Sequence, residues 1–581
     1  MEQRVFKGIG VSGGVRIAKA FIYRQPKVDC NRDITPENVS AEVNRLKIAV
    51  TTADEEVSEL INRVANQIGE KQLGVLKGQK SMLADPAFVP EIEKLITGNC
   101  YSAEKAVSQV TEKFISLFAA MPNEYMKERA SDIRDAGNRL IKHLSKQIGK
   151  SLSEINEKII LVADDLSASD TVQLDRNYVI GFATEKGGKT SHTSIFANSL
   201  GIPAVVGVRG LLTEIKDGDT MVLDGSEGLC IQSPNKEALG IYQKKYEDEQ
   251  ELSQLYKNFS YKESVLSDGS RIIAAANIGS ASDLKFSISQ GAEAVGLMRT
   301  ETLFMSRSNA PAEEEQFLEY KKAAEAFSNL KPGGVIIRTL DIGGDKAAGY
   351  FNIMPEANPF LGLRAIRLCL KRENIFLTQL RAILRASAFG KIKVMFPMIS
   401  GIEELRKAKK LFQQAKNELD NKGIAYDPQI QTGIMIEIPS AALMSDILAS
   451  EADFFSIGTN DLTQYTLAAD RGNKNVSEIY DNFDPAVLQL IRITIEAARH
   501  HNIPVGMCGS MAGNPAAAPL LAGMGINELS MAPGMIPQIK YVLSKCSLHE
   551  CEKLAEKTRQ CISAREIHET VDEFTKKLSL V

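Results

Sequence analysis

The segment from Gly187 to Ser194 places a histidine, His192, between a glycine turn and the expected start of a helix. Thr190 or Ser191 could cap that helix. The free backbone amides at a helix start favour an anion, and neutral imidazole is a competent nucleophile once one ring nitrogen is held by a hydrogen bond. The pattern therefore indicates an imidazole that accepts a phosphoryl group. The alternative is a capping or packing histidine.

Three arginines follow β-type runs in the C-terminal half of the chain. Arg299 ends one run, Arg338 lies in the next, and Arg471 comes shortly after a later one. Guanidinium groups are forked, permanently charged donors that suit phosphate and carboxylate groups. Taken singly, each arginine is more typical of a surface charge or a structural ion pair. Because all three are associated with β-type runs, their positions favour one shared anion site.

Two carboxylates and a thiol follow neighbouring runs. Glu437 lies inside the apolar stretch Met435–Pro439, where an unpaired carboxylate is costly to bury. Asp461 ends the next run, and a few protein carboxylates together with substrate oxygens are the usual ligands of Mg2+. Cys508 lies among small residues, where a thiol could exchange a proton with a substrate carbon. We expect a small ligand carrying both phosphate and carboxylate, bound with Mg2+.

These residues are predicted to share one rim of a (β/α)8 barrel. Eight β-type runs alternate with helical segments, and barrel chemistry lies at the carboxyl ends of the strands. The alternative is an open doubly wound sheet. The runs are Ile272–Ile278, Ala294–Thr300, Val335–Asp341, Ile392–Ile399, Gly433–Ile438, Phe454–Asp461, Pro504–Gly509 and Glu528–Pro533.

The N-terminal half is predicted to be an α/β domain interrupted by a helical bundle. Short strands with glycines occupy Val5–Tyr23 and return from Ile159, while apolar residues at helical spacing between them indicate about four helices. The predicted domains are residues 1–25 with 150–234 (α/β), 26–149 (bundle), 235–262 (polar helical linker) and 263–581 (barrel).

Composition excludes several classes of protein. The net charge of -4 and the lack of a basic block argue against nucleic-acid binding. No apolar run is long enough to insert into a membrane, and no signal peptide is visible at the start. The eight scattered cysteines indicate reduced thiols in a cytoplasmic protein. The remaining histidines are interpreted as structural, including His500 and His501 at the end of a barrel helix.

The segment around His192 resembles the phosphohistidine motif of the phosphoenolpyruvate (PEP)-utilising enzymes. The stretch Ser456–Arg471 is similar to their second motif. Within that family the chain resembles enzyme I of the PEP:sugar phosphotransferase system over nearly its whole length. The related dikinases need a large ATP-binding domain, and too few residues precede His192 to form one.

This resemblance implies a role for each candidate residue. His192 would carry the phosphoryl group on Nε2, with Thr171 holding its ring. Glu437 and Asp461 would ligate Mg2+, and Cys508 would protonate the enolate as pyruvate forms. The residues implied in binding PEP are Arg299, Arg338, Arg364, Asn460, Asp461 and Arg471, supported by Lys346.

The resemblance also implies partners. The α/β domain would be a swivelling phosphohistidine domain, the helical bundle would bind the carrier protein HPr, and the barrel would form a homodimer. Asn198, Ser510 and Asn514 depart from the residues usual in the family. These departures leave open a regulatory homologue that binds PEP or HPr with weak turnover. A stand-alone phosphatase that forms pyruvate, or a dikinase fragment, is the other alternative.

Overall fold

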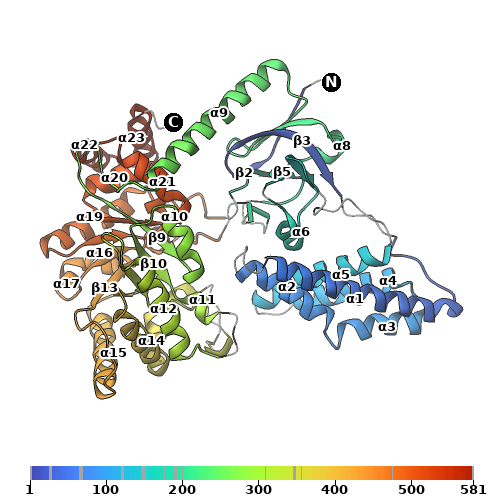
Figure 1. Cartoon of the computed structure of the whole chain (residues 1–581), viewed down its shortest axis with the longest axis horizontal. Coiled ribbons are helices and arrows are strands. Elements are labelled where there is room, and N and C mark those ends of the chain that lie inside the picture. Colours follow the sequence, from blue (N-terminus) through green and yellow to red (C-terminus); the bar gives the residue numbers. More distant parts are fainter. Residues whose placement is uncertain are drawn as a thin grey trace. The chain divides into compact units, whose positions relative to one another are not determined.

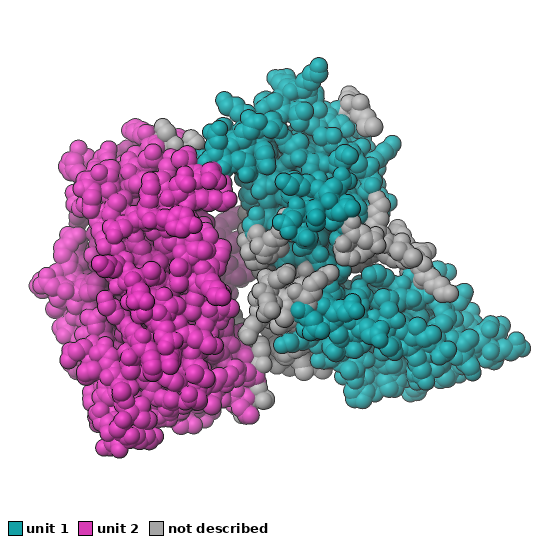
Figure 2. All heavy atoms as spheres, in the orientation of Figure 1, with its two compact units in different colours: residues 1–252 teal, residues 253–581 magenta. Residues whose placement is uncertain are grey.

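The chain divides into two compact units, residues 1–252 and residues 253–581 (Figure 2). The computed structural model describes residues 3–24, 29–64, 70–119, 124–145, 152, 155–175, 177–188, 193–194, 196–197, 201–305, 307, 309–344, 349–351, 353–354, 356–473 and 475–578.

The first unit contains a mixed sheet whose strands lie on both sides of the helical segment in the sequence (Figure 1). The strand order is β1-β8-β7-β3-β4-β5-β6-β2, and β3 pairs in parallel with β4, so Lys19 lies opposite Ile159. The buried strand β4, Ile-Ile-Leu-Val-Ala, is rich in the β-branched residues that fit a pleated sheet. The strands are β1 (Arg4–Lys7), β2 (Ile9–Ser12), β3 (Val15–Tyr23), β4 (Ile159–Ala163), β5 (Val179–Thr184), β6 (Ala204–Val206), β7 (Thr220–Asp224) and β8 (Leu229–Gln232).

Five helices make up the described part of the bundle, rather than the four or so predicted. The Asp85-Pro86 break separates two short helices, because the ring of a proline disfavours helical backbone in the residue before it. The helices of this unit are α1 (Val39–Val64), α2 (Glu70–Leu83), α3 (Phe88–Asn99), α4 (Ala103–Ala119), α5 (Glu124–Ser145), α6 (Ala168–Gln173) and α8 (Leu211–Glu214), and α9 (Lys236–Phe259) runs into the second unit.

The second unit is a closed barrel of eight parallel strands, so the predicted α/β fold with a (β/α)8 barrel is confirmed and the open sheet is excluded (Figure 1). Its strands are buried and apolar because helices cover the outer face. They are β9 (Ile273–Ile278), β10 (Ala294–Arg299), β11 (Val335–Arg338), β12 (Ile392–Phe396), β13 (Gln431–Ile436), β14 (Phe455–Ile457), β15 (Val505–Met507) and β16 (Glu528–Met531).

The helices of the second unit connect these strands and extend beyond the last one. They are α10 (Leu284–Ser289), α11 (Glu301–Phe304), α12 (Glu313–Phe327), α13 (Ile366–Lys371), α14 (Glu373–Ser387), α15 (Ile402–Asn421), α16 (Pro439–Leu443), α17 (Ser445–Ala449), α18 (Thr459–Leu467), α19 (Pro485–His500), α20 (Ala517–Met524), α21 (Ile536–Leu543), α22 (Leu548–Arg559) and α23 (Ala564–Lys577). In the part of the chain that the structure describes, none of the helices is long and apolar enough to cross a membrane.

The sixth predicted run extended too far, because β14 ends at Ile457 and Asp461 lies in the first turn of α18. The polar sequence Thr-Asn-Asp fits a helix start better than a buried strand, since short polar side chains and negative charge are favourable there. The predicted domain boundaries stay a prediction.

Candidate active site

The carboxyl ends of the barrel strands carry a network of buried charges. Arg338, the last residue of β11, forms ion pairs with Glu301 and with Asp341, whose Oδ2 lies 3.2 Å from Nη2. Burial alone would lower the pKa of Arg338, but these two carboxylates outweigh it and raise the pKa. The Nε–H of Arg338 is buried and has no hydrogen-bond partner among the described residues. One donor of this guanidinium is therefore available.

Arg364 is only 1% exposed and uses all five of its N–H donors within the protein. Nε donates to Asp341 Oδ1 at 2.9 Å, and Nη2 donates to Asp341 Oδ2 and to Asp461 Oδ2, each at 3.2 Å. Nη1 donates to Asp461 Oδ1 and to the Tyr465 hydroxyl, also at 3.2 Å. In this arrangement Arg364 orients two carboxylates.

Arg299 and Arg471 differ from the other two arginines, because their side chains form no hydrogen bond or ion pair with any residue that the structure describes. Both are exposed at the barrel rim. Desolvation lowers the pKa of Arg299, and repulsion from Arg338 and Arg471 adds to this effect. Arg299 lies opposite Arg338 where β10 and β11 pair, so at least two of these guanidinium groups start from neighbouring positions. Such a group of cations would be stabilised by a bound anion.

Glu437 directly follows β13 and is 1% exposed. Its Oε1 accepts the Met398 N–H at 2.7 Å. Burial raises the pKa of Glu437, and the nearby carboxylates Asp461 and Asp341 raise it further, against the opposing effect of the buried arginines. Glu437, Asp461 and Asp341 are buried carboxylates that repel one another. Their oxygens are the hard ligands that a divalent cation needs. The residues present therefore fit Mg2+.

Cys508 directly follows β15 and is 3% exposed, with its backbone N–H donating to Ile457 O at 3.0 Å. Gly509 must be glycine, because a Cβ there would lie 1.9 Å from Thr459 Oγ1. Burial raises the pKa of Cys508 to about 11, although Ser456 and Arg338 oppose the shift. The thiol therefore keeps its proton at neutral pH and can act as an acid.

Asn460 lies one residue before Asp461 in the first turn of α18 and is fixed by Ser510. The backbone N–H and the hydroxyl of Ser510 donate to Asn460 Oδ1 at 3.0 and 2.7 Å. The amide Nδ2 of Asn460 is thereby oriented away from these donors and left for another acceptor. Ser510 thus positions a predicted binding residue.

Models of three PEP-utilising enzyme domains match the chain in succession. The N-terminal domain model matches residues 7–129, the mobile domain model residues 155–228, and the PEP-binding domain model residues 253–548. The chain belongs to the PEP-utilising enzymes. The PEP-binding model covers all the rim residues described above.

Curated relatives in this family extend over nearly the whole chain. The phosphoenolpyruvate-protein phosphotransferase of Staphylococcus carnosus (strain TM300) is 42% identical over 98% of this chain and 99% of its own length. That of Geobacillus stearothermophilus is 43% identical over 98% of this chain and 97% of its own length. The Staphylococcus aureus protein is 41% identical over 99% of this chain and all of its own length. The resemblance to enzyme I is thereby confirmed.

Two of the predicted site residues, His192 and Lys346, lie outside the described residues, as does the departure at Asn198. On the C-terminal side of His192, the helical residue Thr193 donates to Leu166 O at 3.0 Å. Thr171 is 2% exposed in α6, whose first turn is capped by Ser167. The role of Thr171 beside the histidine stays a prediction.

Sequence reasoning gave no role to Glu301, Asp341, Tyr465 or Ser510, which hold the predicted residues in place. Glu301 and Asp341 lie two or three residues after strand ends, so the rule that found the arginines could have found these carboxylates as well. Tyr465 and Ser510 act through contacts that link distant parts of the chain, and no local pattern marks them.

Proposed function

We propose that this PEP-utilising enzyme is a phosphoenolpyruvate-protein phosphotransferase. It transfers the phosphoryl group of PEP to His192, releases pyruvate, and passes the phosphoryl group to a histidine of HPr. The observation that carries this proposal is the contrast among the rim arginines. Arg364 is fully engaged by Asp341, Asp461 and Tyr465. Arg299 and Arg471 have no side-chain partner among the described residues, and Arg299 lies opposite the partly available Arg338.

The guanidinium groups that are not fully engaged suit the phosphate and carboxylate of PEP. Arg299, Arg338 and Arg471 provide forked donors to these anions, and the Nδ2 amide of Asn460 adds a neutral donor. Arg364 acts by holding Asp461 in place, and Lys346 would supply a further cation. These donors align the substrate and neutralise its charge, which is the main requirement of phosphoryl transfer.

Glu437 and Asp461 would hold Mg2+, which when bound supplies a Lewis acid that neutralises phosphate charge. Gly458 leaves room for the Glu437 carboxylate, because a Cβ at position 458 would lie only 3.1 Å from Glu437 Oε2. Arg364 fixes Asp461 through both carboxylate oxygens, so one ligand is oriented before any ion arrives.

The transfer breaks the P–O bond of PEP and forms a P–N bond at Nε2 of His192, leaving the enolate of pyruvate. The Cys508 S–H gives its proton to the methylene carbon of the enolate, and the thiolate regains a proton from water. The raised pKa of Cys508, about 11, supports this role because the acid is fully protonated before the reaction.

His192 would be held by Thr171 until it receives the phosphoryl group, and the bundle of residues 26–149 would bind HPr. Since the histidine must reach both the rim and HPr, the α/β domain must swivel on its connections. The barrel of residues 263–581 would form the homodimer, and the enzyme would act in the cytoplasm.

Incubation of the protein with PEP labelled on phosphorus and Mg2+, with and without HPr, tests this proposal. We expect acid-labile label on the protein that moves to HPr when HPr is added. The His192→Ala variant should carry no label. His549→Ala, which changes an exposed histidine in α22, is the matched control and should behave as the unaltered chain.

Label that persists in His192→Ala would contradict the assignment of the acceptor. Binding of PEP and HPr without label or pyruvate would instead favour a regulatory homologue. Label that does not move to HPr but is released as phosphate would favour a phosphatase.

A further inference from the structure

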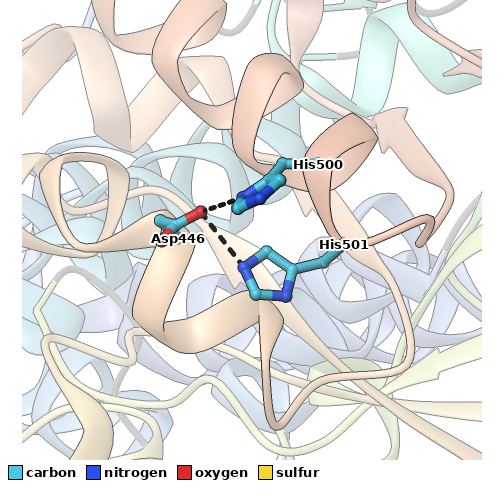
Figure 3. A group of neighbouring side chains, drawn as sticks. All are labelled: Asp446, His500 and His501. Atoms are coloured by element: carbon cyan, nitrogen blue, oxygen red, sulfur yellow. Dashed lines mark hydrogen bonds and ion pairs between the residues drawn. The ribbon is translucent and has the colours of Figure 1, made fainter.

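Three side chains on the outside of the barrel bring two imidazoles to one carboxylate oxygen. Asp446 lies in the first turn of α17, His500 is the last residue of α19, and His501 follows it (Figure 3). Asp446 Oδ1 lies 2.8 Å from His500 Nδ1 and 3.1 Å from His501 Nε2. The potential ligand atoms of all three residues lie within 4.8 Å of one another.

The end of α19 makes this arrangement possible. The helical hydrogen bonds stop at His501, and Asn502 adopts a left-handed conformation with a φ of 56°. At this helix end the adjacent imidazoles use different ring nitrogens to reach the same oxygen, as Figure 3 shows. Their rings are 4.8 Å apart and inclined by 69°, so they converge instead of stacking.

Two of the three ligand-to-ligand distances suit a transition-metal ion. Ligand atoms about 2.1 Å from an ion lie about 2.9 to 3.4 Å apart for bond angles of about 90° to 110°. The two measured O···N distances, 2.8 and 3.1 Å, are close to this range. The side chains of Asp446 and His500 are 64% and 73% exposed, so they can adjust and leave positions for water ligands.

We propose that Asp446, His500 and His501 form a binding site for a divalent transition-metal ion such as Zn2+, separate from the magnesium site of the barrel rim. The choice of ion follows from the donors. Two imidazoles and one carboxylate favour Zn2+, Co2+ or Ni2+, whereas the oxygen-only set at Glu437 and Asp461 favours Mg2+. A bound ion would join the start of α17 to the end of α19.

Titration of the tag-free full-length chain with Zn2+ or Co2+ tests this proposal. Excess Mg2+ is present throughout, so that the proposed magnesium site at Glu437 and Asp461 is not available to the added metal. Zn2+ is followed by calorimetry and Co2+ by its visible absorption. We expect one equivalent to bind, without the intense charge-transfer band of thiolate ligands. His500→Gln, His501→Gln and Asp446→Asn should each weaken binding roughly tenfold or more.

The matched control is His549→Gln. His549 is also 73% exposed and lies 4.0 Å from a carboxylate, that of Glu552, but among the described residues it belongs to no cluster of potential metal ligands. This variant should bind the metal as the unaltered chain does. Equal affinity in the unaltered chain and the three cluster variants would overturn the proposal, as would a thiolate spectrum for the bound Co2+.

Thermal melting gives a second measurement that does not depend on spectra. An ion that binds only the folded chain raises the melting temperature. We expect Zn2+ to raise it for the unaltered chain and for His549→Gln, but not for His500→Gln. If Zn2+ raised the melting temperature equally in the unaltered chain, His549→Gln and His500→Gln, the proposed site would also be wrong. Melting without metal shows that each variant is folded.

Discussion

The two ends of the barrel both bury charged side chains, but they do so differently. At the amino ends of the strands, Lys540 is 2% exposed and donates to Lys262 O and Gly291 O at 2.7 and 2.6 Å. It also lies 3.5 Å from Glu293, which accepts the Ser264 N–H. At the carboxyl ends, Arg338 and Arg364 are buried and paired with carboxylates, whereas the side chains of Arg299 and Arg471 have no partner among the described residues.

This difference shows that a buried charge does not by itself mark a functional site. The amino end satisfies its charges internally, which is what a structural role requires. The carboxyl end leaves guanidinium donors without a protein partner, which costs stability unless a ligand uses them. Changes at the amino end should therefore alter stability, and changes at the carboxyl end should alter activity.

The largest effect should come from Lys540→Met. The variant leaves Glu293 buried with a weaker partner and two carbonyls without a donor, so the unfolding free energy of the barrel should fall by about 3 to 5 kcal/mol. Pyruvate formation per folded molecule should not change. Chemical denaturation and a steady-state assay measure the two quantities. Lys545→Met, at an exposed lysine nearby, should change stability by less than about 0.5 kcal/mol.

Arg299→Met should have the opposite profile. Removing one fixed donor to a charged substrate should lower kcat/KM for PEP by about 10²- to 10³-fold, while the melting temperature stays within error. Steady-state kinetics with pyruvate detection measures this effect. Arg299→Lys keeps the positive charge but loses the two parallel N–H donors of the guanidinium, so it should recover only part of the loss in kcat/KM. A large loss of stability in Arg299→Met would contradict the contrast between the two ends.

Cys508→Ala should separate two steps of the reaction. Loss of the acid should slow pyruvate formation about 100-fold, whereas PEP binding should survive. Pyruvate release and equilibrium binding of PEP are measured on the same preparation. Cys230→Ala removes a buried thiol of the first unit and serves as the control, with unchanged kinetics expected. Unimpaired pyruvate formation in Cys508→Ala would remove the thiol from the mechanism.

The smallest effect should be a change in pH dependence at the amino end. Burial raises the pKa of Glu528 from 4.5 to about 7, with Lys393 opposing the shift. A raised pKa favours the protonated folded form, so this contribution to stability is present below about pH 4.5 and is lost as the pH rises through about 7. Glu528→Gln should flatten the fall in melting temperature between about pH 5 and about pH 8.

Glu573→Gln is the control for this measurement. Hydrogen bonds from Lys577 and Lys557 hold the pKa of Glu573 at about 2, so its charge does not change in that pH window. If Glu528→Gln does not change the slope of melting temperature against pH, the pH dependence must come from other groups.

The barrel could be predicted from the sequence because each strand is a short apolar run between helical segments, and the position of Arg299 and Glu437 followed from the rule for strand ends. The engagement of Arg364 could not be predicted. It depends on Asp341, in the loop after β11, and Asp461, in the first turn of α18, approaching from two different parts of the rim, which requires the closed barrel. The cluster of Asp446 with His500 and His501 was missed for the same reason, since more than 50 residues separate the carboxylate from the imidazoles.

The pairing of β3 with β4 has a consequence for the synthesis of the chain. Lys19 leaves the ribosome about 140 residues before its partner Ile159, which is a wait of roughly ten seconds at ordinary translation rates. The bundle helices emerge during this wait and make mostly local contacts, so they can fold first. Once folded, they shorten the effective loop between the two strands and reduce the entropy lost when the strands pair. The insertion that interrupts the sheet in the sequence thus assists its assembly.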